Sequence, residues 1–109
     1  MEEPPPGIET WALNTATLFS CEDWQPVRHV LPPPSAAGSP PILVVGTTHD
    51  PATPYSGAQH LAAALTTGVL LTWEGQGHTA YLKSECIDTA VDAFLVSQKV
   101  PAVGTTCPA

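Results

Sequence analysis

The chain has 109 residues, of which 43% are hydrophobic and 12% charged, and ten acidic residues against three lysines and arginines give it a net charge of −7. This length suits one small domain, and the apolar content is that of a globular chain rather than a disordered one. Three cations are too few to neutralise a phosphate backbone, so we expect no nucleic-acid partner and no affinity for an anionic membrane surface.

No apolar run approaches the ~20 residues that cross a bilayer, so we expect no membrane span. The first residues, Met1 to Pro6, are acidic and rich in proline, whereas a secretory signal begins with basic residues and has an apolar centre. We therefore expect no signal peptide in these residues. If the parent protein is exported, its signal lies upstream.

Residues 1–40 are predicted to form a lead-in that combines a helix with a proline-rich segment. Residues 9–19 include Trp11, Leu13 and Phe19 and lack glycine and proline, which favours a helix. Residues 32–41 (PPPSAAGSPP) form a low-complexity stretch with polyproline character. Because apolar segments flank this stretch on both sides, we interpret it as a long surface loop.

Residues 41–109 are predicted to form an α/β unit. Ile42 to Val45 are four consecutive branched apolar residues, a pattern typical of a strand buried on both faces of a parallel sheet. Residues 55–65 carry apolar side chains at helical spacing, and a second strand is expected from Val69 to Trp73. This order predicts two parallel strands joined by a crossover helix.

The helix boundaries can also be predicted. Thr53 is expected to cap the crossover helix, with Pro54 at its first helical position. A C-terminal helix is expected from Ser84, its cap, to Val96. Its apolar face is expected to consist of Ile87, Val91, Phe94 and Leu95. The tail, residues 100–107, is expected to be irregular.

Two parallel strands with flanking helices do not make a stable sheet by themselves. Parallel strands are normally covered on both faces and belong to larger sheets. We therefore expect that the chain is incomplete or docks onto a partner that completes its sheet.

The three cysteines are Cys21, Cys86 and Cys107. They form no Cys-x-x-Cys pair, so zinc-type spacing is absent. We favour a disulfide between Cys86 and Cys107, because the residues after the C-terminal helix are numerous enough to reach back along it. Three reduced, buried thiols remain the alternative, and a disulfide would indicate an oxidising compartment.

An acid and a histidine follow the two predicted strands in turn. Asp50 lies in the loop after the first strand, and His78 lies after the second, between Gly77 and Thr79. Neighbouring parallel strands lie ~4.8 Å apart, so residues just beyond their carboxyl ends can meet. This is the order in which an α/β-hydrolase presents the last two members of its triad. The nucleophile motif G-x-S-x-G does not occur in the sequence.

Simpler interpretations exist for each of these residues. Asp50 precedes a proline and could be only a turn residue, and His78 could be an ordinary loop histidine. His49 is most simply an exposed turn residue. His60 is expected to face outward from the crossover helix, and its spacing from the other histidines matches no metal motif, so we expect no metal site. Of the neighbouring aromatic residues, Trp73 and Tyr81 are expected to be packing residues.

The segments PPILVVGTTHDPATPY, LLTWEGQGHTAY, CIDTAVDAFL and VPAVGTTC resemble the C-terminal domain of tripeptidyl aminopeptidase-like serine peptidases. These are exported α/β-hydrolases related to the proline iminopeptidase group. The segment CEDWQP resembles a Cys-x-x-Trp-Pro segment of the family, with Gln25 inserted. The resemblance extends from about Phe19 to Cys107.

The resemblance implies that Asp50 is the triad acid and His78 the triad base, in the C-terminal part of an α/β-hydrolase fold. It implies peptide hydrolysis near a free amino terminus through an acyl-enzyme, with no cofactor. Cys86 and Cys107 match cysteines that bridge in the family, and Cys21 would pair with a cysteine in the missing part. The nucleophile, the oxyanion hole and the substrate-capping region are absent from these residues.

The leading hypothesis is therefore the C-terminal catalytic segment of a secreted or cell-envelope serine exopeptidase. Its partners would be a peptide substrate in the full-length parent and the N-terminal hydrolase portion that completes the sheet. A non-catalytic truncated remnant is the first alternative. A complementing subunit, which needs a partner chain that carries the serine, is the second.

Overall fold

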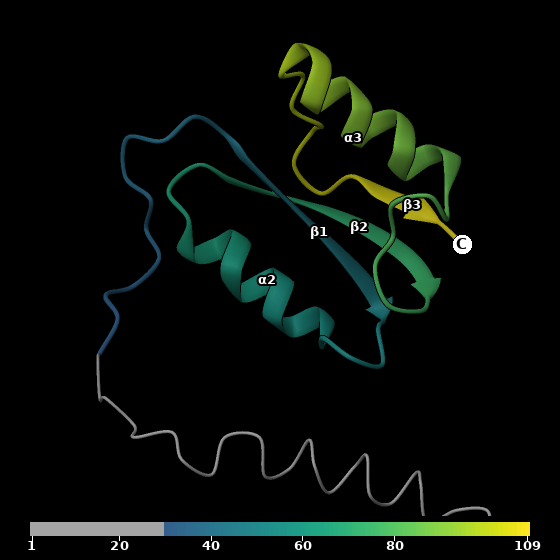
Figure 1. The fold of residues 1–109 in the computed structure, drawn as a ribbon, viewed down its shortest axis with the longest axis horizontal. Helices are drawn as coiled ribbons and strands as arrows, with labels where there is room; N and C mark the ends of the chain where they lie inside the picture. The colour runs from purple at the N-terminus through teal and green to yellow at the C-terminus, as the bar shows by residue number, and fades with distance from the viewer. Residues whose placement is uncertain (1–29) are drawn as a thin grey trace, which may run out of the picture. The chain divides into compact units, whose positions relative to one another are not determined.

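A computed structural model describes residues 30–109, which carry a three-stranded parallel sheet in the order β1-β2-β3 (Figure 1). The elements in chain order are β1 (Ile42–His49), α2 (Tyr55–Ala64), β2 (Gly68–Gln76), α3 (Glu85–Ser97) and β3 (Thr106–Pro108). The α/β class predicted from the sequence is confirmed. Within the described residues, no helix is long and apolar enough to cross a membrane. The helix expected over residues 9–19 and the CEDWQP segment lie outside this range.

Strands β1 and β2 form the longer of the two strand pairings, and both strands extend beyond the apolar runs that predicted them. Their pairing runs in register from Ile42 opposite Gly68 to Thr47 opposite Trp73, then shifts so that His49 lies opposite Gln76. The added residues at the carboxyl ends are mostly polar. They remain in the sheet because strand pairing uses main-chain groups, which every non-proline residue supplies.

The tail contains a third strand, where an irregular segment was predicted. In β3, Thr106 lies opposite Thr72 and Cys107 opposite Trp73, parallel to β2. The strand has only three residues, and Pro108 is a residue that strands disfavour, so the local sequence gives little strand signal. Burial of Cys107, which is 0% exposed, and its disulfide hold the segment against β2.

The core lies between the sheet and α3. Its fully or largely buried members are Leu71, Trp73, Ala80, Ile87 and Cys107, with Leu43, Ala90 and Val91 packed against them. The predicted apolar face of α3 is correct for Ile87 and Val91. It is wrong for Leu95, which is 68% exposed in this chain.

The opposite face of the sheet is covered by α2. A Cβ atom at Gly46 would lie 2.9 Å from atoms of both Ala58 and Tyr55, so the missing side chain lets the helix approach the strand closely. The Tyr55 hydroxyl lies 2.6 Å from the hydroxyl of Thr72 on β2. Helices α2 and α3 therefore lie on different sides of the sheet (Figure 1).

Neither predicted helix cap forms the expected side-chain bond. Pro54, not Thr53, is the N-cap residue of α2, because the Thr53 hydroxyl donates to Asp50 instead. Ser84 is the N-cap residue of α3, as predicted, but its hydroxyl caps no N–H group. The Asp88 carboxylate, in the first turn of α3, instead accepts the N–H of Leu82 at 2.7 Å.

A disulfide joins Cys86, in the first turn of α3, to Cys107 in β3. The two Cα atoms are 5.7 Å apart and the residues are 21 positions apart in the sequence. The bridge therefore closes a loop that contains most of α3 and the return segment to the sheet. Cys21 lies outside the described residues.

Removal of this bridge is expected to destabilise the chain. In the chain-entropy account, a loop of this size contributes about 3 kcal/mol to the free energy of unfolding. The double variant Cys86→Ala/Cys107→Ala should lower that free energy by about this amount in urea titrations at neutral pH. A double variant that keeps the wild-type unfolding midpoint would contradict a stabilising role for the bridge.

Candidate active site

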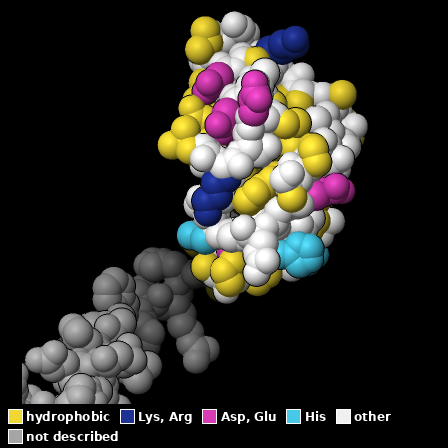
Figure 2. All heavy atoms as spheres, turned by 90° about the vertical axis from the view of Figure 1, so that its right-hand side faces the viewer, with side chains coloured by type: hydrophobic (Ala, Val, Ile, Leu, Met, Phe, Trp, Pro, Cys, Tyr) yellow, Lys and Arg dark blue, Asp and Glu magenta, His cyan; other side chains and the backbone are white. Residues whose placement is uncertain are grey.

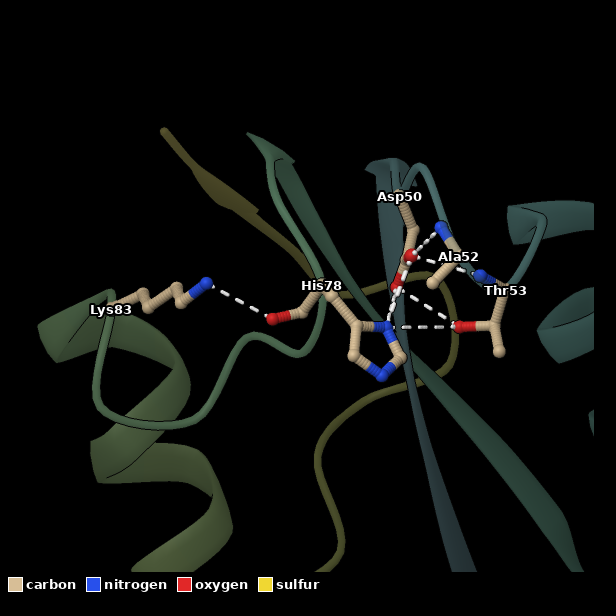
Figure 3. Close-up of polar contacts among 5 residues, drawn as sticks. All are labelled: Asp50, Ala52, Thr53, His78 and Lys83. Atoms are coloured by element: carbon tan, nitrogen blue, oxygen red, sulfur yellow. Dashed lines mark hydrogen bonds and ion pairs between the residues drawn. The ribbon is translucent and has the colours of Figure 1, made fainter. Parts of the chain in front are cut away.

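Asp50 and His78 lie at the same edge of the sheet, because each follows the carboxyl end of one of two neighbouring parallel strands. The His78 Nδ1 atom lies 3.1 Å from Oδ1 and 3.0 Å from Oδ2 of Asp50 (Figure 3). The two side chains that the sequence singled out are therefore hydrogen-bonded to each other.

The Asp50 carboxylate is held by its own loop. Oδ1 accepts the main-chain N–H of Ala52 at 2.8 Å and that of Thr53 at 2.9 Å. Oδ2 accepts the Thr53 hydroxyl at 3.0 Å. With the imidazole of His78 as a further partner, the carboxylate is only 6% exposed although it lies in a surface loop. Its orientation is thus set by contacts within the chain itself.

These contacts favour the charged form of the acid. The N–H of Thr53 lowers the pKa of Asp50 most, and the N–H of Ala52, the imidazole of His78 and the hydroxyl of Thr53 add to the effect. Desolvation opposes them, but the net result is a pKa well below the usual value of 3.8. Asp50 is therefore ionised at neutral pH.

His78 is more open than its partner. Its side chain is 54% exposed, and the backbone on either side of it has positive φ, +130° at Gly77 and +64° at Thr79. A carboxylate at Nδ1 favours the tautomer with the proton on that nitrogen, which leaves Nε2 free to accept one. The second ring nitrogen lies on the side away from Asp50 (Figure 3). This arrangement can accept a proton from a hydroxyl placed next to Nε2.

A groove of about 560 Å³ lies beside the pair. Besides Asp50 and His78, its walls include Val45, Thr47, Tyr55, Tyr81 and Val91. Residues of both faces of β1 contribute, because Thr47 and Gly46 are consecutive in the strand. The groove therefore follows the outer edge of β1, where no further strand is paired within residues 30–109.

The two other histidines within residues 30–109 do not join this site. The His49 ring is exposed, and its Nδ1 lies 3.1 Å from the Thr48 hydroxyl. His60 is exposed on α2, as predicted. Among residues 30–109, no cluster of three or more histidine, cysteine or carboxylate side chains could hold a metal ion.

The two aromatic residues that flank the histidine loop have different surroundings. Trp73 is a core residue, 6% exposed, as predicted. Tyr81 lines the groove, and its hydroxyl donates to Asp92 at 2.8 Å. This contact and the charge of Asp92 raise the pKa of Tyr81 above its ordinary value of 10.0.

Thr53 and Lys83 were not recognised as site residues in the sequence. Thr53 was assigned to a helix cap, although its spacing of three residues after an aspartate is a pattern in which the hydroxyl and N–H can return to the carboxylate. The Lys83 ammonium donates to the His78 carbonyl at 3.0 Å. Nothing in the local sequence distinguishes Lys83 from an ordinary surface lysine.

Comparison with known proteins shows the family of the chain. The chain matches the family described as TAP-like protein over residues 9–107. It belongs to this family of α/β-hydrolases. The match includes both strands that present Asp50 and His78, and the Cys86–Cys107 bridge.

Several curated proteins are similar over most of the chain. It is 43% identical over 95 residues to "Serine protease Hip1" of Mycobacterium tuberculosis, which covers 84% of this chain and 18% of that protein. It is 37% identical over 89 residues to "Carboxylesterase B" of the same species, an alignment that covers 80% of this chain and 17% of that protein. It is 33% identical over 102 residues to "Tripeptidyl aminopeptidase" of Streptomyces lividans, covering 90% and 19%. The chain thus spans less than a fifth of these relatives.

The stability of the chain should depend on pH through Asp50. The pKa of Asp50 is lower in the folded chain than its ordinary value of 3.8. The stabilisation that the ionised carboxylate gives to the folded state is therefore fully present above pH 3.8 and is lost as the pH falls below it. Below pH 3.8, the free energy of unfolding should therefore fall more steeply in wild type than in Asp50→Asn, which cannot take up this proton. Urea titrations over an acidic pH series measure both slopes.

Glu74→Gln is the matched control for this comparison, because it removes one negative charge from an exposed position on β2. Its slope should stay close to that of wild type. Equal slopes for wild type and Asp50→Asn would contradict the proposed contacts at the carboxylate.

Proposed function

We propose that this chain is the C-terminal catalytic segment of a serine hydrolase, and more narrowly of a secreted, tripeptidyl aminopeptidase-like exopeptidase that removes peptides from an amino terminus. The hydrogen bond between His78 Nδ1 and the Asp50 carboxylate is the single observation that carries this proposal. Membership of the TAP-like family and relatives named as a serine protease and a tripeptidyl aminopeptidase support it. The chain supplies the acid and the base but not the serine.

In the proposed mechanism, the serine hydroxyl lies beside His78 Nε2. As the serine oxygen attacks the peptide carbonyl carbon, Nε2 takes the hydroxyl proton, and Asp50 stabilises the imidazolium that forms. The imidazolium then gives this proton to the leaving amine, and an acyl-enzyme remains. Water repeats the sequence and releases the acyl group. Each proton moves between the imidazole and the serine, the leaving amine or water, so the proposed mechanism needs no cofactor or metal.

We further propose that the partner of residues 41–109 is the N-terminal hydrolase portion, with residues 1–40 as the lead-in to this segment. The outer edge of β1 supports this, because Val44 and Thr47 are buried while the main chain of the strand has no neighbour on that side among the described residues. A strand docked there would continue the parallel sheet and bring its own loops to the groove. Peptide substrates are inferred from the names of the relatives.

Secretion or attachment to the cell envelope is proposed for the parent protein. The Cys86–Cys107 disulfide supports this, since such bridges persist in oxidising compartments.

One observation favours a second candidate, a complementing subunit or a non-catalytic remnant: the 109 residues contain no G-x-S-x-G motif. Upstream coding sequence in the same frame with this motif would support the segment of a longer enzyme. Co-purification with a chain that bears the serine would support the subunit. The absence of both findings would support the non-catalytic remnant.

The isolated chain should not react with a fluorophosphonate probe, because its sequence lacks the G-x-S-x-G motif that presents an activated serine. Mass spectrometry after incubation with the probe checks this. If one of its own serines is labelled, and the labelling disappears in His78→Ala, the proposal that the serine lies outside this chain would be contradicted.

In the assembled hydrolase, that is, this segment together with the portion that bears the serine, Asp50→Asn should lower kcat by up to about 10⁴-fold, because the imidazole loses the partner that fixes its tautomer. His60→Gln, an exposed histidine on α2, is the matched control and should leave kcat unchanged. Steady-state hydrolysis of a tripeptide amide measures both. Unchanged turnover in Asp50→Asn would remove Asp50 from the mechanism.

A further inference from the structure

The loop that carries His78 has an unfavourable backbone conformation. We call residues 77–84 the histidine loop. Three of its residues have positive φ: +130° at Gly77, +64° at Thr79 and +67° at Leu82. Thr79 and Leu82 have side chains that disfavour this region, so the loop keeps its shape only where contacts outweigh that cost.

The second half of the histidine loop is fastened to α3. The Leu82 N–H donates to the carboxylate of Asp88 at 2.7 Å, and the Tyr81 hydroxyl donates to that of Asp92 at 2.8 Å. Ala80 is 3% exposed and belongs to the core. These contacts fix the loop from residue 80 onward, but none of them reaches the main chain of His78.

The main chain of His78 is held by Lys83. The Lys83 ammonium donates to the His78 carbonyl at 3.0 Å and lies on the side of the loop away from Asp50 (Figure 3). Figure 2 shows acidic side chains gathered on one part of the surface, and α3 carries Glu85, Asp88 and Asp92. Within residues 30–109, however, Lys83 forms no ion pair with a carboxylate. The His78 carbonyl is therefore the hydrogen-bond acceptor of the Lys83 ammonium group within these residues.

Gly77 makes room for this contact. A Cβ atom at Gly77 would lie 3.1 Å from the Lys83 ammonium nitrogen, closer than about nine in ten real Cβ contacts, so the ammonium would have to shift slightly. Gly77 therefore serves the loop twice, through its φ of +130° and through the space it leaves for the ammonium. The ammonium of Lys83 thus lies against the backbone of both Gly77 and His78.

We propose that Lys83 is a positioning residue for His78, an inference that rests on the proposed function. The imidazole is 54% exposed, so packing alone does not fix it, and Asp50 holds only its Nδ1 end. A hydrogen bond from a charged donor is stronger than one from a neutral donor. The lysine thus fixes the main chain of His78 from one side while the carboxylate fixes the ring from the other.

Three variants separate this role from a general effect of charge or folding. Lys83→Met keeps most of the stem and removes the donor, and Lys83→Arg restores a cationic donor. Lys99→Met is the matched control, because it removes the other lysine of residues 30–109, which lies after α3 on a different cavity. Urea midpoints of all three should be measured first, so that a change at His78 is not confused with unfolding.

The first readout uses the 109-residue chain. Nitrogen-15 shifts of the His78 ring, recorded at alkaline pH where imidazoles are neutral, give the ratio of its two tautomers. We expect the Nδ1–H tautomer to dominate in wild type, Lys83→Arg and Lys99→Met, and to decline in Lys83→Met toward the mixture of an unconstrained imidazole. A wild-type ratio retained in Lys83→Met would overturn the proposal.

The second readout is turnover in the assembled hydrolase. Lys83→Met should lower kcat by about 10- to 100-fold with KM unchanged, because a misplaced base slows the chemical step and leaves substrate binding intact. Lys83→Arg should recover most of the loss. Equal kcat in wild type and Lys83→Met would overturn the role of Lys83 and leave the proposed function standing. A tautomer shift in Lys83→Met with no turnover in any assembled form would instead support the positioning role and reject the proposed function.

Discussion

The parallel pairing of β1 with β2 is the constraint on which the rest of the unit depends. Neighbouring parallel strands end at the same edge of a sheet, so the loops that follow them meet. That meeting puts Asp50 within hydrogen-bonding distance of His78, although the two residues are 28 positions apart in the sequence. The crossover helix α2, packed closely at Gly46, keeps the two strands side by side and is therefore part of the support of the site.

The sequence predicted those parts of the structure that depend on long, regular patterns. The crossover helix after Tyr55 and the final helix appear close to their predicted bounds, and β1 begins at Ile42 as predicted but continues to His49. The order of acid and histidine after two strands also predicted their convergence. These features follow from hydrophobic periodicity and from the geometry of parallel sheets. Both depend on many residues together, so no single contact decides them.

The missed features depend on single contacts between distant residues. The Cys86–Cys107 disulfide was predicted and is present, but β3 has only three residues, and the pairing of Cys107 with β2 is revealed by no local pattern. Threonine is a residue type that often caps helices, but the hydroxyl of Thr53 donates to the Asp50 carboxylate instead. The contact of Lys83 with the carbonyl of His78 depends on the path of the loop between them. Such contacts can be found only once the chain is folded.

The third strand also determines how the sheet can grow. Pro108 has no N–H group, and only three residues of β3 are paired, so the free side of this strand is a poor template for another chain. At the opposite edge of the sheet, the longer strand β1 has main-chain donors and acceptors that no other strand of residues 30–109 pairs with. Extension is thus directed toward the edge that carries the acid, and random edge-to-edge aggregation is discouraged at the other.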